Sequence, residues 1–375
     1  MDLTFLTSIH GTTGPVASLN INSSRDAEDA DHEVRVRWSK ARADLRSQGA
    51  DEETLTAMEA VVGETKGVAG PHGHVVFAAD GQILAQDTVT EFPQDYRARV
   101  GPLPDPLLYL YSESPRIAHV LAVIDSVGGD LRVVQGDGRV INYRVEGEDW
   151  PVQKVRGAAY HHNQLQRAVD NQVADNAGRV AGAIANAVRY HGAEVVGIAG
   201  EVQIRGEVRV RLPEWAEEKA VDLEAGARHA GAGRSPLEEE LQEVLLAQAQ
   251  RQTAEALASL EQGRANRDRV AEGLTNVVYA LQRGQVQTLL WSTANTGAEE
   301  RLWFGPAAEQ LALTDQELRD MGVTQPVQEL AGPVLLRAAA AGAAELLLIP
   351  QQEDTAQLSG GLGALLRFDD PNLSG

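Results

Sequence analysis

The first third of the chain alternates between strand-like and helix-like patterns of apolar residues. Residues 15–21 alternate apolar and polar side chains, as a half-buried strand does. Between Asp26 and Arg46 the apolar residues instead recur at helical spacing, and a second helix is predicted from Asp51 to Thr65. Residues 74–85 form two apolar runs around Asp80-Gly81, a dipeptide suited to the positive backbone dihedrals of a hairpin turn.

The middle third combines strands with long helices. Two apolar runs around Gly128-Gly129 predict a hairpin over residues 119–135, and residues 140–145 predict an extended segment. Apolar residues at helical spacing predict a helix from about Gln164 to His191, followed by a buried strand over residues 193–200 that glycine ends. The strong helix formers of residues 236–265 predict a further long helix.

The last third repeats helix and strand. Helices are predicted over residues 269–281 and 328–341, and strands over residues 286–291 and 346–349. A glycine-led strand near Leu365 follows. This alternation predicts an α/β protein in which helices cover small sheets.

Composition excludes several classes of protein. The 375 residues are 43% hydrophobic and 23% charged and include no cysteine, so disulfides, thiolate metal sites and a cysteine nucleophile are excluded. The first residues have no signal-peptide pattern, and no run of about 18 apolar residues occurs. We therefore expect a cytoplasmic protein with no membrane association.

The charge of the chain is strongly negative but uneven. The net charge is −21, and a protein of that sign is repelled by nucleic acid unless its basic side chains gather on one face. One basic cluster lies between Glu33 and Gln48, and a second between Pro151 and Tyr190. Either cluster could contact RNA, or could be a solvated helix face.

Signatures of enzymes are largely missing. The chain has no phosphate-binding GxxxxGK[ST] loop, no GxSxG nucleophile motif and no HExxH metal motif. His72 and His74 lie two residues apart without a third nearby ligand, so we interpret them as surface histidines. The sequence predicts neither a metal site nor a cofactor.

Three segments together resemble a known family. Gly360-Gly361-Leu362 leads the last apolar strand, the alanine-rich residues 338–344 run into the strand at 346–349, and residues 155–164 open a long helix. In this order and at these separations they resemble the bacterial branch of the archaeo-eukaryotic release factor family. This branch includes the ribosome hibernation factor Balon and its actinobacterial relatives.

The resemblance implies three domains of an α/β multidomain protein. An N-terminal α/β domain would span residues 1–116, and an RNase H-like middle domain with a central loop at 157–166 would span residues 117–266. An αβ-layered C-terminal domain of the kink-turn-binding ribosomal protein type would span residues 267–375. The resemblance also implies a helix over residues 201–212, although their valines and Ile204 alternate as in a strand.

The resemblance further implies a ribosome-binding translation factor that occupies the A site of idle or stalled ribosomes, as a hibernation or stress factor does. The middle-domain loop would point at the peptidyl transferase centre. Contacts to rRNA or tRNA would come from the loop region and from the first basic cluster: Lys154, Arg156, Gly157, Tyr160, His161, His162, Asn163, Gln164, Arg167, Arg35, Arg37, Lys40 and Arg42. Asn163 would cap the long helix, and Tyr160 with the two histidines would suit unpaired bases. From Thr275 onward five arginines stand against twelve carboxylates, so the C-terminal domain would bind a protein, such as a translational GTPase.

Catalysis is where this chain departs from the family. Release factors use a Gly-Gly-Gln loop, whereas Gly157 here is followed by Ala158-Ala159-Tyr160, and Gln164 and Gln166 come later in the first helical turns. We therefore predict docking without ester hydrolysis. Two alternatives stay open: a peptidyl-tRNA hydrolase that uses Gln164 or Gln166 to rescue stalled ribosomes, and an acidic stress protein that binds another protein without RNA contact.

Overall fold

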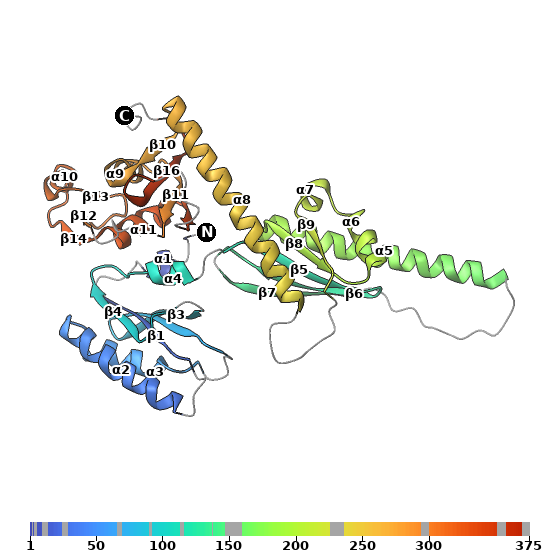
Figure 1. Ribbon diagram of the computed structural model, residues 1–375, viewed down its shortest axis with the longest axis horizontal. Coiled ribbons are helices and arrows are strands. Elements are labelled where there is room, and N and C mark those ends of the chain that lie inside the picture. Colours follow the sequence, from blue (N-terminus) through green and yellow to red (C-terminus); the bar gives the residue numbers. More distant parts are fainter. Residues whose placement is uncertain are drawn as a thin grey trace. The chain divides into compact units, whose positions relative to one another are not determined.

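The computed structural model describes most of the chain as two compact units. The described residues are 1, 3, 6–9, 14–24, 29–65, 70–89, 92–112, 116–136, 138–146, 160–225, 236–293, 300–350 and 358–369. Side chains of the long middle helix are described from Val173 onward. One unit combines residues 1–114 with 253–375, and the other is formed by residues 115–252. Each unit is described by itself (Figure 1).

The N-terminal sheet of the first unit has the order β3-β2-β1-β4. Its strands are β1 (Val16–Asn22), β2 (Gly73–Ala79), β3 (Gln82–Val89) and β4 (Tyr96–Gly101). Helices α2 (Ala30–Ser47) and α3 (Glu52–Val61) cover one face, where Leu19 and Ile21 pack with Trp38 and Met58. The predicted strand, both helices and the hairpin are confirmed, and Asp80 and Gly81 have the positive φ values 49° and 71°. Strand β4 was not predicted.

The C-terminal part of the same unit holds a sheet of order β10-β16-β11-β15. These strands are β10 (Val270–Glu272), β16 (Leu362–Leu366), β11 (Val286–Ser292) and β15 (Glu345–Ile349). Helices α9 (Gly273–Gln282) and α11 (Ala331–Ala341) pack in its core together with α1 (Leu6–Ile9) and α4 (Leu107–Ser112), and the turn η2 (Ser359–Gly361) leads into β16. A separate sheet of order β13-β12-β14 contains β12 (Arg301–Phe304), β13 (Leu311–Ala312) and β14 (Val327–Leu330), with α10 (Asp315–Asp320) beside it.

Two helices in this part begin later than the sequence predicted. The helix predicted from residue 269 begins at Gly273, because residues 270–272 pair with β16 as a strand. The helix predicted from residue 328 begins at Ala331, because residues 327–330 pair with β12. In both cases a partner far away in the sequence fixes the strand, so the local pattern could not reveal it.

The second unit is built on a five-stranded sheet of order β7-β6-β5-β8-β9. The first three strands, β5 (His119–Ile124), β6 (Gly128–Val134) and β7 (Val140–Glu146), are antiparallel, and β8 (Val195–Ala199) and β9 (Ala220–Leu223) run parallel to β5. This is the strand order of an RNase H-like fold. The core beside α5 (Tyr160–His191) includes Val120 and Val133, whereas Leu237 and Leu241 of α8 (Pro236–Asn266) pack with Leu121 and Val195. The predicted multidomain α/β class is therefore confirmed.

The implied helix over residues 201–212 forms as α6 (Val202–Arg209), which α7 (Glu214–Glu217) follows. Ile204 and Val208 lie four residues apart and are buried, as one helix face requires. Val202 and Val210 complete the strand-like alternation, but they are 75% and 84% exposed. The alternation thus misled because two of its apolar residues face solvent.

Candidate functional site

The predicted docking loop leads into α5, the longest helix of the second unit. Lys154, Arg156 and Gly157 lie outside the described residues. Helix α5 begins at Tyr160, four residues before the predicted start at Gln164, so Tyr160 to Asn163 are helical rather than loop residues. Asn163 is therefore inside the helix, and its prediction as the helix cap is wrong. Gln164, Gln166 and Arg167 lie in the helix as predicted, with side chains outside the described part.

Helix α5 divides into a packed half and a projecting half. Its residues in the core of the unit run from Ala177 to Val188. The helix has 32 residues, which corresponds to a length of about 48 Å. Figure 1 shows its N-terminal half extending past the end of the sheet. The fold thus carries the predicted docking residues away from the core that anchors them.

The first basic cluster lies on α2, where carboxylates neutralise most of it. Arg37 binds Glu33 at 2.7 Å, and Arg42 binds Glu59 at 2.7 Å and Glu52 at 3.2 Å. Arg46 binds Glu52 at 2.5 Å. This hydrogen bond is the main cause that raises the pKa of Arg46 and lowers the pKa of Glu52. Lys40 and Arg35 are exposed. Glu52 and Glu59 come from α3, outside the sequence window that defined the cluster, so α2 has fewer available cations for RNA than the sequence indicated.

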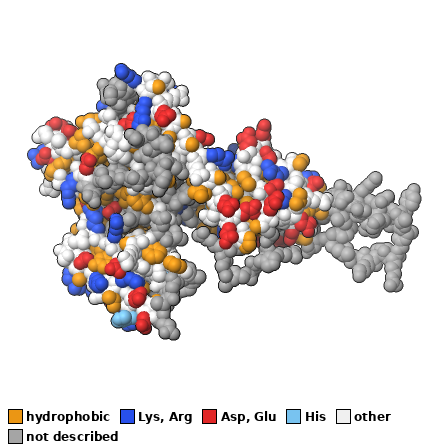
Figure 2. All heavy atoms as spheres, in the orientation of Figure 1, with side chains coloured by type: hydrophobic (Ala, Val, Ile, Leu, Met, Phe, Trp, Pro, Cys, Tyr) orange, Lys and Arg blue, Asp and Glu red, His pale blue; other side chains and the backbone are white. Residues whose placement is uncertain are grey.

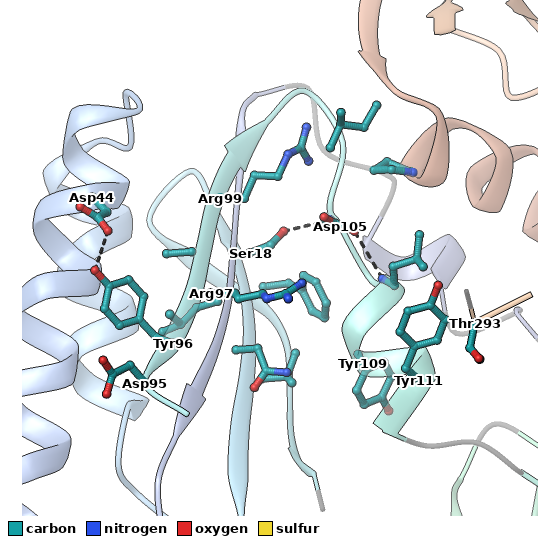
Figure 3. A pocket seen from close by; sticks show the side chains of 18 residues that line it. Ser18, Asp44, Asp95, Tyr96, Arg97, Arg99, Asp105, Tyr109, Tyr111 and Thr293 are labelled. Carbon is teal, nitrogen blue, oxygen red and sulfur yellow. Dashed lines mark hydrogen bonds between the residues drawn. The ribbon is translucent and has the colours of Figure 1, made fainter. Parts of the chain in front are cut away.

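A cavity of about 820 Å³ lies on the face of the N-terminal sheet opposite α2 and α3 (Figure 3). Its polar lining includes Arg97 and Arg99, which extend from β4, and Ser18, whose hydroxyl accepts a hydrogen bond from the Asp105 amide at 3.0 Å. At one edge, Tyr96 donates to Asp44 at 2.5 Å. This hydrogen bond raises the pKa of Tyr96 to about 12. Tyr109, Tyr111, Phe77 and Leu107 form an apolar and aromatic wall.

The middle of the chain is similar to a known protein family. Residues 118–266 match the model of bacterial archaeo-eukaryotic release factor family 2. This segment is similar to the bacterial archaeo-eukaryotic release factor family. The resemblance found in the sequence is confirmed at this level, and closeness to Balon stays a prediction.

Relatives and solved structures of similar chains cover nearly the whole sequence. "Uncharacterized protein Rv2629" of Mycobacterium tuberculosis is 27% identical over 368 residues, 96% of each chain. The archaeal translation termination factor aRF1 is 16% identical over 96% of this chain and 95% of its own, with a TM-score of 0.26. Dom34 of S. cerevisiae is 10% identical over 81% and 82%, with a TM-score of 0.38. These structural likenesses are weak, so the similarity to the release factor family rests on the match of residues 118–266 to the family model.

Two histidines predicted to lie at the surface are buried in the structure. His72 and His74 are 2% and 4% exposed, so their interpretation as surface residues is wrong. The His72 ring bonds the Gly70 carbonyl at 2.9 Å and the Thr65 hydroxyl at 2.8 Å. Within the described part of the chain, no three acidic or histidine side chains are grouped to hold a metal ion, and no helix is long and apolar enough to cross a membrane.

Two buried histidines predict how stability depends on pH. Burial lowers the pKa of His74 and of His119, so each favours its neutral form in the folded state. In the unfolded chain both titrate near 6.5. The unfolded state therefore binds more protons as pH falls below about 6.5, and the free energy of unfolding decreases there.

We expect chemical denaturation at pH 7.5 and pH 5.5 to show this loss, and expect His74→Gln and His119→Gln each to reduce it. Carboxylates titrate mostly below this window, so the histidines dominate the change. His32, which is exposed on α2, provides the control His32→Gln. An identical pH dependence in all four proteins would rule out a contribution from the buried histidines.

The cavity residues were missed because their sequence signal is ambiguous. In β1, Ser18 and Asn20 alternate with Leu19 and Ile21, which is the usual pattern of a strand with one solvated face. In the structure both polar residues are buried, with exposures of 7% and 5%. Only the tertiary packing of α4 and the C-terminal part reveals that this polar face is enclosed.

Proposed function

We propose that this protein is a ribosome-binding translation factor that occupies the A site of idle or stalled ribosomes in the cytoplasm. The observation that carries the proposal is the match of residues 118–266 to a release factor family model. The projection of α5 supports it, because a docking element must reach beyond the body of its domain. The N-terminal end of α5 and the preceding residues would approach the peptidyl transferase centre.

Within this proposal the cationic contacts to RNA come mainly from the α5 end. The paired arginines of α2 would each have to give up a carboxylate partner before they could bind phosphate. Lys154, Arg156 and Arg167 are the remaining cations near the predicted tip. Acidic side chains spread over one face of the second unit (Figure 2). This face would be turned away from rRNA, because phosphate repels it. The C-terminal part would bind a protein, such as a translational GTPase.

In this proposal the protein occupies the A site but does not cleave the peptidyl-tRNA ester. Gln164 and Gln166 are helical residues, and a helical backbone cannot approach an ester as an extended Gly-Gly-Gln loop does. We therefore expect the protein to compete with aminoacyl-tRNA for the A site of vacant 70S ribosomes, without cleaving peptidyl-tRNA in stalled complexes.

Both assays use the full chain. Cleavage that Gln164→Ala or Gln166→Ala abolishes would establish a rescue hydrolase instead. Unchanged tRNA binding at saturating protein would rule out A-site occupancy and favour the protein-binding alternative.

A further inference from the structure

The cavity on the N-terminal sheet is floored by two cross-strand rows of side chains. Ser18 of β1 lies between Arg99 of β4 and Phe77 of β2, and Asn20 lies between Arg97 and Val75. Residues directly opposite in a sheet project from the same face. All six side chains line the cavity.

These rows change in character across the sheet. The β4 residues are arginines, and the β1 residues supply the Ser18 hydroxyl and the Asn20 amide. The β2 residues, Val75 and Phe77, are apolar. Since neighbouring strands are about 4.8 Å apart, the cationic and apolar edges are separated by about 10 Å. A molecule that fits this floor has an anionic end, polar groups in its middle and an apolar body.

Several polar groups of the floor have no partner within the described part of the chain. The amide oxygen of Asn20 is unbonded although the residue is only 5% exposed. Arg99 pairs with Glu329 through one terminal nitrogen, while its other terminal nitrogen is buried and unbonded. Arg97 is exposed and pairs with no described carboxylate. Buried polar groups are nearly always hydrogen-bonded, so this floor has unused binding capacity.

The aromatic wall is held in place. Tyr109 packs edge to face on Phe77 with ring centroids 6.5 Å apart, and its hydroxyl donates to Asp87 at 2.8 Å. Burial raises the pKa of Tyr111, so its hydroxyl stays protonated at neutral pH. A wall fixed in this way can receive a flat ring at little entropic cost.

Among the described residues, no carboxylate that lines the cavity pairs with Arg97 or Arg99, and the charge of Arg99 is offset by Glu329 from outside the lining. Asp44 accepts from Tyr96, Asp105 accepts from the Leu107 amide at 3.4 Å, and Asp95 lies 3.9 Å from Arg37. Each is therefore directed elsewhere.

We propose that this cavity binds a nucleoside phosphate, with the phosphate at Arg97 and Arg99 and the base between Asn20 and the aromatic wall. Its volume of about 820 Å³ lies within the range of small-ligand sites. The guanidinium groups match the geometry of phosphate oxygens, and the Asn20 amide offers both a donor and an acceptor to a base edge. This site lies in the first unit and does not depend on ribosome binding by the second.

Isothermal titration of the full chain tests the proposal, with ATP, GTP, CTP and UTP as probes in the presence of Mg²⁺. We expect at least one to bind, and expect inorganic pyrophosphate alone to bind at least roughly tenfold more weakly because it cannot use the base contacts. Arg97→Gln and Asn20→Leu should each weaken binding about tenfold or more, since the first removes a charged, forked donor and the second removes an amide donor and acceptor.

Two controls keep the result interpretable. Arg144→Gln changes an exposed strand arginine of the other unit and should bind as the wild type does. Arg97 is exposed, so Arg97→Gln should melt at the wild-type temperature, which separates lost binding from lost folding. The proposal is overturned if no probe binds with a Kd below about 1 mM, or if Arg97→Gln and Asn20→Leu bind as tightly as the wild type.

Discussion

Replacing Tyr160, His161, His162 and Asn163 together with alanine is expected to weaken ribosome binding at least roughly tenfold, if these residues stack on unpaired rRNA bases. Stacking on an aromatic side chain contributes about 1–3 kcal/mol per base. All four positions lie in the first turns of α5, and alanine is the strongest helix former, so the backbone of the helix should persist. A filter-binding or sedimentation titration with 70S ribosomes measures the change.

The matched control replaces exposed residues of the other long helix of the chain, Gln242, Leu246 and Gln250 of α8, with alanine. It should leave ribosome affinity within about twofold, because these positions take no part in the proposed docking. Equal affinity of the wild type and the α5 variant, with unchanged melting, would show that the start of α5 does not contact the ribosome.

Breaking the ion pair between Arg99 and Glu329 is expected to destabilise the first unit by about 3 kcal/mol. The Glu329 side chain is 2% exposed and that of Arg99 is 24% exposed, so Arg99→Met leaves a fully buried charge unpaired. Glu329→Leu should cost less, because the partly exposed guanidinium can still reach water. The double variant should recover most of the loss, since a buried pair contributes little compared with apolar side chains of similar size.

Urea denaturation followed by tryptophan fluorescence measures this cycle, and Trp38, Trp291 and Trp303 report on the first unit. Arg319→Met provides the comparison, because it breaks an exposed pair with Asp315 on α10 and should cost less than about 1 kcal/mol. Strictly additive losses in the Arg99 and Glu329 variants would mean that the two side chains do not stabilise each other.

Local signals in the sequence were sufficient for much of the fold. The Asp80-Gly81 turn, the central strand β1 and the long helix α8 each depend on neighbouring residues and formed as predicted. The family resemblance supplied α6, which the pattern of its own residues contradicted. Short strands such as β4, β9 and β12 escaped prediction because a strand is completed by partners that are distant in the sequence.

The functional residues were harder to predict for the same reason. The basic residues of α2 are paired by Glu52 and Glu59, which a count within residues 33–48 does not include. Burial of His74 and Asn20 depends on contacts across β1 and β2. The cavity that Asn20 lines needs residues as far apart as Ser18 and Pro333. The division into three domains and the ribosomal contacts remain predictions.

Sedimentation with ribosomes tests the central claim most directly. The full chain is layered with vacant 70S ribosomes on sucrose gradients at 50 and 200 mM salt. Three phosphate contacts from Lys154, Arg156 and Arg167 predict co-sedimentation at the lower salt and an affinity roughly 40-fold weaker at the higher. A protein that stays at the top of the gradient at 50 mM salt would contradict the account.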